Sequence, residues 1–194
     1  MAELYAIVGS MERARLMLEA GAPYLQLRFK GTPLAPHREE VQGWRKDYPG
    51  TRVIVNDDLE LACAWGVWGA HLGQEDLDSH DPGAIRAASV QVGISTHSDE
   101  EIERALACDP ALLGFGPVFP TATKEIEHAP QGVARLREIV ERSTLPIVAI
   151  GGIGEEQLQP VVETGVAMVA MISFLDRFHE PAQVRDLMAR MAGP

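Results

Sequence analysis

Short runs of valine, isoleucine and leucine alternate with helical patterns along the whole chain, and this alternation constrains the fold more than any other feature. Such runs predict β-strands, and the segments between them predict helices. We predict strands at residues 4–8, 24–29, 52–56, 69–72, 90–95, 112–115, 146–150 and 167–172. Helices are expected at residues 11–20, 36–47, 58–65, 81–88, 99–107, 131–142, 155–164 and 181–191. Eight strand-then-helix units favour a closed parallel (β/α)8 barrel, the TIM barrel.

A doubly wound open sheet is the competing architecture, because it uses the same alternation with fewer units. No linker is long or polar enough to divide the chain, so we expect one domain over residues 1–194. A content of 46% hydrophobic and 23% charged residues fits a single domain with a substantial core.

The net charge of −11 and the pI near 4.9 argue against nucleic acid or an anionic membrane surface as a partner, because both are bound mainly by basic patches. The N-terminal segment lacks the pattern of a signal peptide, and charges or glycines interrupt every apolar stretch. We therefore expect a cytoplasmic protein. Cys63 and Cys108 lie far apart and outside metal-ligand spacing, so neither a disulfide framework nor a structural zinc is expected.

Active sites of barrels lie at the carboxyl ends of the strands, so the residues at those ends are the candidates for function. In the strand at 24–29, Gln26, Arg28 and Lys30 alternate with apolar residues. Helices cover the outside of a barrel, so the polar set is expected to face the lumen near its mouth. Two cations there favour an anionic ligand over a structural ion pair.

The two following strands end with acidic residues. Asn56 and Asp57 follow the third strand, and Asp76 follows the fourth. Neighbouring parallel strands bring their carboxyl ends together, so Asp57 and Asp76 are candidate ligands of Mg²⁺, with water and substrate oxygens completing the shell. A helix-capping role is the alternative reading, and Asp58 is expected to cap the next helix.

The segment FGPVFPTATK, residues 115–124, runs from a buried strand into a loop. Pro117 and Pro120 cannot join a hydrogen-bonded ladder, so they end the strand and stiffen the loop. Thr121, Thr123 and Lys124 then supply several donors and one positive charge, which suit a phosphate or carboxylate. A solvated loop without a ligand is the alternative.

The remaining strand ends carry small and hydroxyl residues. Ser95 ends the fifth strand and His97 follows it, but no nucleophile elbow surrounds them. Ser95 is therefore interpreted as a hydrogen-bond donor in the mouth, and His97 either as a helix-start group or as a group that acts behind the residues in contact with the ligand. Gly152 and its neighbouring glycines follow the seventh strand, and Ser173 follows the eighth. This is where barrels recurrently bind phosphate.

The sequence thus predicts two anion sites. Arg28, Lys30, Asn56, Lys124 and the Mg²⁺ form the first; Gly152 and Ser173, with Thr121 and Thr123, form the second. Such a site suits the departure of a phosphate-type leaving group, whose developing charge the cations stabilise. The candidate catalytic residues are Arg28, Lys30, Ser95 and Lys124.

The motifs LQLRFK, VNDD, GAHLGQEDL, GISTH, FGPVFPTATK, APQG, VAIGGI and MIS, in this order, closely resemble the thiamine-phosphate synthase family. The resemblance implies a TIM barrel that joins 4-amino-2-methyl-5-hydroxymethylpyrimidine diphosphate to 4-methyl-5-(2-phosphoethyl)thiazole and releases pyrophosphate. It further implies which residues hold each ligand. The pyrimidine diphosphate would contact Gln26, Arg28, Lys30, Asn56, Ser95 and Lys124; Mg²⁺ would contact Asp57 and Asp76; the thiazole phosphate would contact Thr121, Thr123, Gly152, Ile172 and Ser173.

Three residues depart from the family pattern: Phe29 stands where a glutamate or a β-branched residue is frequent, Asp58 where an arginine is frequent, and Phe174 where an alanine is frequent. The rival activities are a thiazole tautomerase, whose members typically lack the paired Asp57 and Asp76, and a phosphate-sensing barrel without turnover. The expected partners are phosphorylated small molecules, and the sequence leaves open whether the chain forms a homo-oligomer.

Overall fold

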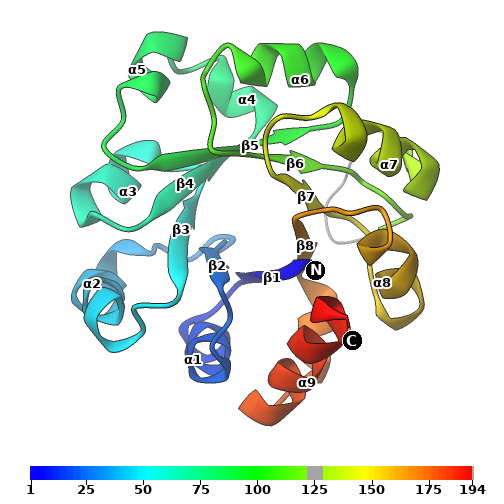
Figure 1. Ribbon diagram of the computed structural model, residues 1–194. Helices are drawn as coiled ribbons and strands as arrows, with labels where there is room; N and C mark the ends of the chain where they lie inside the picture. Colours follow the sequence, from blue (N-terminus) through cyan, green and yellow to red (C-terminus); the bar gives the residue numbers. More distant parts are fainter. Residues whose placement is uncertain (122–128, 194) are drawn as a thin grey trace.

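The structure is a closed barrel of eight parallel strands surrounded by helices, seen in a computed structural model that describes residues 1–121 and 129–193 (Figure 1). The strands pair in chain order, and β8 returns to pair with β1. They are β1 Glu3–Val8, β2 Tyr24–Leu27, β3 Arg52–Asn56, β4 Gly69–Leu72, β5 Gln91–Thr96, β6 Leu112–Phe115, β7 Ile147–Ala149 and β8 Met168–Met171. The predicted TIM barrel is confirmed, and pairing of β1 with β8 excludes the open sheet.

Helices follow the strands and form the outer layer of the barrel (Figure 1). They are α1 Met11–Ala20, η1 Ala35–His37, α2 Arg38–Asp47, α3 Leu59–Trp65, α4 Gln74–Leu77, α5 Pro82–Arg86, α6 Asp99–Leu106, α7 Gly132–Arg142, α8 Glu155–Val162, η2 Ser173–Arg177 and α9 Pro181–Ala192; η1 and η2 are 3₁₀ helices. Asp58 caps α3 as expected, since its Oδ1 accepts from the backbone N–H of Leu61 at 2.8 Å.

Alternation along each strand produces two apolar layers. In β2, Leu25 and Leu27 belong to the large cluster between strands and helices, whereas Tyr24 joins Tyr5 and Ile7 in a smaller cluster inside the barrel. The period-2 pattern of a strand accounts for this division, because successive side chains point to opposite faces. Polar residues that share the inner face are therefore directed into the lumen.

Several elements differ from the prediction in their bounds, and two of the differences concern β2 and the segment after β4, where candidate site residues lie. β2 ends at Leu27 rather than at residue 29, because its neighbour β1 ends at Val8, the residue paired with Leu27. The segment after β4, expected as a loop, forms the short helix α4. The Asp76 carboxylate accepts from the backbone N–H of Gly73 at 2.7 Å and so caps this helix.

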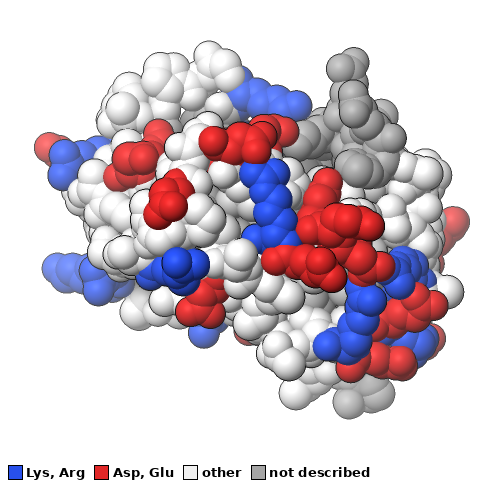
Figure 2. All heavy atoms as spheres, turned by 90° about the horizontal axis from the view of Figure 1, so that it is seen from above, with Lys and Arg blue, Asp and Glu red and all other residues white. Residues whose placement is uncertain are grey.

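Charged residues of both signs lie on the surface, and several of them form ion pairs. On the face shown in Figure 2, acidic and basic side chains are interspersed, and typical pairs are Arg104–Asp78 at 2.5 Å and Arg135–Glu138 at 2.7 Å. Such exposed pairs contribute little to stability. Across the described ranges, every helix is too short or too polar to cross a bilayer.

Candidate active site

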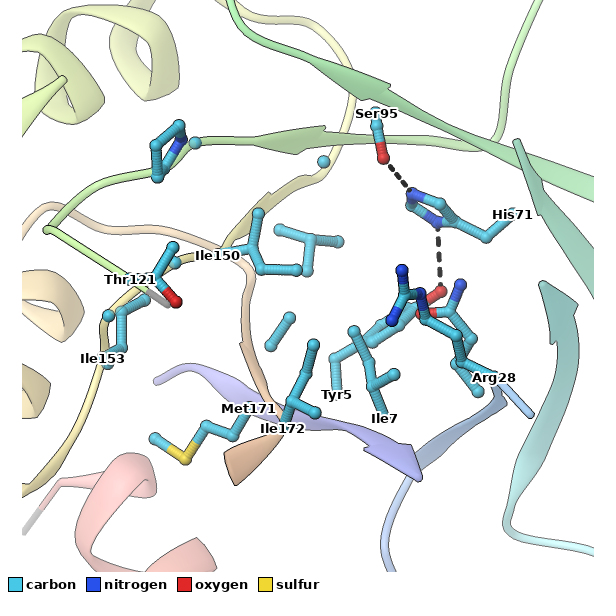
Figure 3. Close-up of a pocket in the computed structure, with 18 of the residues that line it drawn as sticks. Tyr5, Ile7, Arg28, His71, Ser95, Thr121, Ile150, Ile153, Met171 and Ile172 are labelled. Atoms are coloured by element: carbon cyan, nitrogen blue, oxygen red, sulfur yellow. Dashed lines mark hydrogen bonds between the residues drawn. The ribbon is translucent and has the colours of Figure 1, made fainter. Parts of the chain in front are cut away.

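A cavity of ≈ 740 Å³ opens at the carboxyl ends of the strands, and every strand or the loop that follows it contributes to its lining (Figure 3). This volume lies in the usual range for small-molecule sites. Ile150, Ile153, Met171, Ile172 and Phe174 make one side largely apolar, while the side nearer β2 to β5 is polar. The cavity can therefore hold a ligand with both an apolar ring and charged groups.

The second strand brings an arginine and an amide to the polar side. Arg28 follows β2 and points into the cavity (Figure 3). Gln26 is buried, and its Nε2 donates to Oδ1 of Asn56 at 2.9 Å, which fixes the orientation of both amides. All three residues were predicted from the sequence and all three line the cavity.

Lys30 does not occupy the lumen position that the alternation predicts. It is exposed, lies three residues beyond the end of β2, and is absent from the lining of the cavity in the described structure. The reason is the early end of the strand, since side-chain alternation does not extend into a loop. A role of Lys30 in ligand binding stays a prediction.

A chain of three polar side chains, one each from β1, β4 and β5, crosses the lumen (Figure 3). The Tyr5 hydroxyl lies 3.2 Å from His71 Nδ1, and His71 Nε2 lies 2.9 Å from Ser95 Oγ. Tyr5 is 1% exposed and His71 is 9% exposed. Burial raises the pKa of the Tyr5 hydroxyl, so this group stays neutral. Only Ser95 was predicted as a site residue.

The sequence offered one signal for the two residues that were missed. Tyr5 and His71 each lie on the inner-facing register of a strand, Tyr5 two positions before Ile7 and His71 two positions after Gly69. A polar residue at an inner position of a barrel strand indicates either a satisfied core group or a ligand contact, and the sequence pattern does not separate these cases.

Carboxylates lie where β3 and β4 end. Asp57 lines the cavity, is exposed and has φ of 62°, and its N–H donates to the His71 carbonyl at 2.8 Å. Asp76 is half-buried, with one oxygen engaged by Gly73. Within the described ranges, no group of three or more His, Cys, Asp or Glu is arranged to hold a metal ion. Two carboxylates with hard oxygen donors still fit Mg²⁺, which is commonly held by one or two of them together with water and substrate phosphate.

The side of the cavity that is predicted to bind phosphate is built on consecutive glycines. Gly151 and Gly152 have φ of 100° and 65°, values that favour glycine. A Cβ on Gly152 would lie 2.8 Å from Cβ of Phe119 and would also meet the Pro120 carbonyl oxygen. The glycine is therefore needed for contact with the β6 loop itself, and not only for the approach of a ligand.

The loop after β6 is tied to the loop after β7. Val118 N–H donates to the Ile150 carbonyl at 2.9 Å, and Phe119 N–H donates to the Gly151 carbonyl at 3.0 Å. These bonds hold Thr121 at the edge of the cavity, close to the glycines (Figure 3). Thr123 and Lys124 lie outside the described residues.

His97 lies at the entrance, two residues before α6 begins at Asp99. Its Nδ1 and its backbone nitrogen are each 2.7 Å from Oε2 of Glu101, and Ser98 caps α6. Ser173 lies at the other side of the cavity, where it begins η2, with Ile172 before it and Phe174 after it. Phe174 thus narrows the cavity from the β8 side.

The fold and the cavity together define a (β/α)8-barrel protein with a small-molecule site at the usual end of the barrel. Residues 4–175 match the family model described as thiamine monophosphate synthase. The chain is 39% identical to the thiamine-phosphate synthase of Citrobacter koseri, over 98% of this chain and 92% of that protein. It is 42% identical to that of Serratia proteamaculans, over 88% and 82%.

The chain belongs to the thiamine monophosphate synthase family, which confirms the resemblance seen in its motifs. It is accordingly an enzyme, a transferase of thiamine biosynthesis. Among solved structures, thiamine phosphate pyrophosphorylase from Pyrococcus furiosus is similar with a TM-score of 0.80 and 28% identity, covering 98% of this chain and 97% of that one. A 3-hexulose-6-phosphate synthase shares the fold alone, with a TM-score of 0.65 and 14% identity.

Proposed function

We propose that this enzyme joins 4-amino-2-methyl-5-hydroxymethylpyrimidine diphosphate to 4-methyl-5-(2-phosphoethyl)thiazole, giving thiamine phosphate and pyrophosphate. The observation that carries the proposal is the division of one cavity into a polar side, with Arg28 and Asp57, and a side built from glycines and apolar residues. Each side suits one phosphorylated heterocycle. Membership of the family supports the same assignment.

In this proposal the pyrimidine diphosphate lies against the polar side. Arg28 supplies positive charge inside the cavity, and the fixed amides of Gln26 and Asn56 supply a donor and acceptor pattern for the ring. Ser95 offers a hydroxyl at the end of β5. Lys30 and Lys124 are assigned to the same ligand from the sequence alone, and loss of Lys124 is expected to cost roughly 2–4 kcal/mol of transition-state stabilisation.

The thiazole phosphate is assigned to the opposite side. Backbone amides around Gly152 and Ser173, which line the cavity, are assigned as the phosphate nest. Thr121 and Thr123 are assigned as further donors, Thr123 from the sequence alone. Ile172 and Phe174 supply apolar surface for the thiazole ring. This arrangement directs the thiazole nitrogen toward the centre of the cavity, where the methylene carbon of the pyrimidine would lie.

The proposed reaction is a dissociative substitution. The bond between the methylene carbon and the diphosphate oxygen breaks, pyrophosphate leaves with the electron pair, and the aminopyrimidine stabilises the resulting cation. The thiazole nitrogen then donates its lone pair to the same carbon, so no general base is required. Mg²⁺ held by Asp57 and Asp76 would supply positive charge next to the departing pyrophosphate. Arg28 would stabilise the same charge from the protein.

The test is pyrophosphate release by the purified enzyme, with each substrate and Mg²⁺ omitted in turn. Release that needs both substrates and the metal is expected. Binding of the thiazole phosphate without release of pyrophosphate would contradict the proposal and favour the thiazole tautomerase or the phosphate-sensing barrel. Removal of Mg²⁺ without loss of rate would contradict the role of the two aspartates.

A further inference from the structure

A chain of hydrogen bonds joins Tyr5, His71 and Ser95, and the structure allows us to infer which group donates in each bond. Tyr5 lies on β1, His71 on β4 and Ser95 on β5, so the chain crosses the lumen beneath the polar side of the cavity. In a neutral imidazole one ring nitrogen donates and the other accepts, and the partners of the two nitrogens decide which is which.

Two glycines next to the His71 imidazole leave the space that the ring occupies. A Cβ on Gly93 would lie 2.8 Å from His71 Nδ1, and a Cβ on Gly114 would lie 3.3 Å from His71 Cε1. The ring therefore occupies space that any other residue at these positions would fill. The edge of the Tyr5 ring packs against it, with ring centroids 6.0 Å apart. A ring confined in this way keeps both nitrogens aimed at the same partners.

The Tyr5 hydroxyl determines the direction of the first bond. Tyr5 is 1% exposed. Within the described residues, its hydroxyl forms a hydrogen bond with His71 Nδ1. A buried hydroxyl hydrogen without an acceptor costs about 1–3 kcal/mol. Donation from Tyr5 to Nδ1 avoids this cost, whereas an Nδ1–H would face the Tyr5 oxygen and leave the Tyr5 hydrogen without that acceptor.

We propose that Tyr5 is a positioning residue: it fixes His71 as the Nε2–H tautomer, and His71 then donates to Ser95 Oγ and turns the Ser95 hydroxyl hydrogen toward the ligand. Ser95 is thereby a donor to the substrate. This inference rests on the proposed function, in which Ser95 contacts the pyrimidine diphosphate. It specifies the contacted atom as a hydrogen-bond acceptor, either a pyrimidine ring nitrogen or a diphosphate oxygen.

The backbone of Ser95 is held by the segment that follows the strand of His71. Gln74 Nε2, just after β4, donates to the Ser95 carbonyl at 2.8 Å. Ser95 is thus fixed by its carbonyl and by its side chain from two residues three apart. The hydrogen of the Ser95 hydroxyl can still rotate about the bond between Cβ and Oγ. The bond from His71 restricts this rotation, because Oγ accepts from Nε2 and the hydroxyl hydrogen must then point away from His71.

The direct test is ¹⁵N NMR of the histidine rings in the full chain without ligand, at neutral pH. The six histidines give six ring systems, and loss of one in His71→Asn assigns the signal. We expect Nδ1 of His71 to give the signal of an unprotonated ring nitrogen and Nε2 that of an N–H. Protonated Nδ1, with or without protonated Nε2, would overturn the proposal.

The substitution Tyr5→Phe tests whether the Tyr5 hydroxyl determines the tautomer of His71. Removing the hydroxyl should give a mixture of His71 tautomers, because Nδ1 no longer receives a hydrogen bond. Tyr24→Phe is the matched control: Tyr24 stacks on Tyr5 with centroids 5.7 Å apart, but its hydroxyl is outside the chain of bonds, so the His71 signals should not change. An unchanged tautomer in Tyr5→Phe, or an equal change in Tyr24→Phe, would contradict the role of Tyr5.

A kinetic cycle separates positioning from a structural role. We expect Tyr5→Phe to lower kcat/KM for the pyrimidine diphosphate by about tenfold, the factor that one hydrogen bond supplies. In a Ser95→Ala background the same change should cost less than about twofold, since no hydroxyl remains to orient. An equal loss of kcat/KM from Tyr5→Phe in the wild-type and Ser95→Ala backgrounds would overturn the inference. If wild-type enzyme releases no pyrophosphate, the proposed function fails, whereas the NMR experiment still decides the tautomer, including when Tyr5→Phe does not fold.

Discussion

The side-chain amide of Gln26 donates to Oδ1 of Asn56 across 2.9 Å, and this bond joins the carboxyl ends of β2 and β3 within the cavity. Gln26 is 2% exposed, so its amide depends on this partner. Asn56→Leu is expected to lower the free energy of unfolding by about 1–3 kcal/mol, because the Gln26 donor is left unsatisfied. Urea unfolding measures the change.

The double change Gln26→Leu with Asn56→Leu provides the control. It removes both polar groups, so its cost should be smaller than the sum of the two single changes. If the cost of the double change equals the sum of the two single costs, the single changes do not act by disrupting the hydrogen bond. The loss of stability must then come from packing at each site.

Gly152 is expected to be intolerant of any side chain. Its φ of 65° and the closeness of Phe119 and Pro120 combine backbone strain with a clash. Gly152→Ala should therefore lower the free energy of unfolding by about 1–3 kcal/mol more than Gly21→Ala, since overpacking adds to the strain. Gly21 is the matched control, because its φ is 79° and a Cβ there meets nothing within 4 Å.

The same variant should raise KM for the thiazole phosphate more than KM for the pyrimidine diphosphate. The distortion is expected to be local to the loops after β6 and β7, which are hydrogen-bonded to each other and form the proposed thiazole side. Equal increases in both constants would contradict the assignment of the two substrates to opposite sides of the cavity.

Asp76 caps a helix, and this structural role affects how its proposed role in metal binding can be tested. Its carboxylate caps α4 through Gly73, so Asp76→Ala is expected to cost about 0.5–2 kcal/mol of stability in addition to any loss of metal. Asp76→Asn keeps an oxygen for the cap but removes the charge. We expect this variant to unfold like the wild type and to lose Mg²⁺-dependent turnover.

Binding of Mn²⁺ to the enzyme with pyrophosphate, measured by calorimetry, checks the assignment without relying on activity. Asp78→Asn is the control, because Asp78 is exposed, lies two residues away and pairs with Arg104. Mn²⁺ binding that is equally strong in Asp76→Asn and Asp78→Asn would remove Asp76 from the metal site.

The pair of Arg15 and Glu40 predicts a pH dependence of stability. Arg15 Nε and Nη2 donate to the two carboxylate oxygens at 2.7 and 2.8 Å, and this hydrogen bonding lowers the pKa of Glu40 below 4.5 in the folded state. Because the folded pKa is the lower one, the pair stabilises the protein above pH 4.5 and loses this contribution as the pH falls through the folded pKa.

We therefore expect Glu40→Gln to be less stable than the wild type at pH 6, with the difference shrinking toward pH 3. Denaturant unfolding at the two pH values measures it. Salt should reduce the difference at pH 6, since the pair is on the surface. A difference that grows as the pH falls would show that the ion pair is not its source.

The fold and much of the polar side of the cavity could be predicted because each rests on local patterns. The alternation of short apolar runs with helical segments required only the period of the side chains, and the residues at strand ends, such as Arg28, Asn56 and Asp57, followed from the barrel. Lys30 failed the same argument because the end of β2 is set by the length of β1, a property of the pairing and not of the segment itself.

His71 and Tyr5 were not predictable for a related reason. Their function as a hydrogen-bonded chain depends on contact between strands that lie 66 residues apart in sequence, and on two glycines that leave room for the imidazole. Asp76 was placed correctly after β4, yet its capping bond depends on a short helix for which the sequence contains no clear signal. Pairwise contacts of this kind are decided by packing and not by periodicity.

The pairing of β8 with β1 also limits when the site can exist during synthesis. β1 leaves the ribosome before β8, so the edge of β1 that pairs with β8 stays unpaired until residue 171 has emerged. Before that point Ile172 and Ser173 are missing from one wall, and the growing chain has no complete cavity. Substrate binding can thus contribute to the stability of the finished barrel, but it cannot assist the nascent chain through most of its translation.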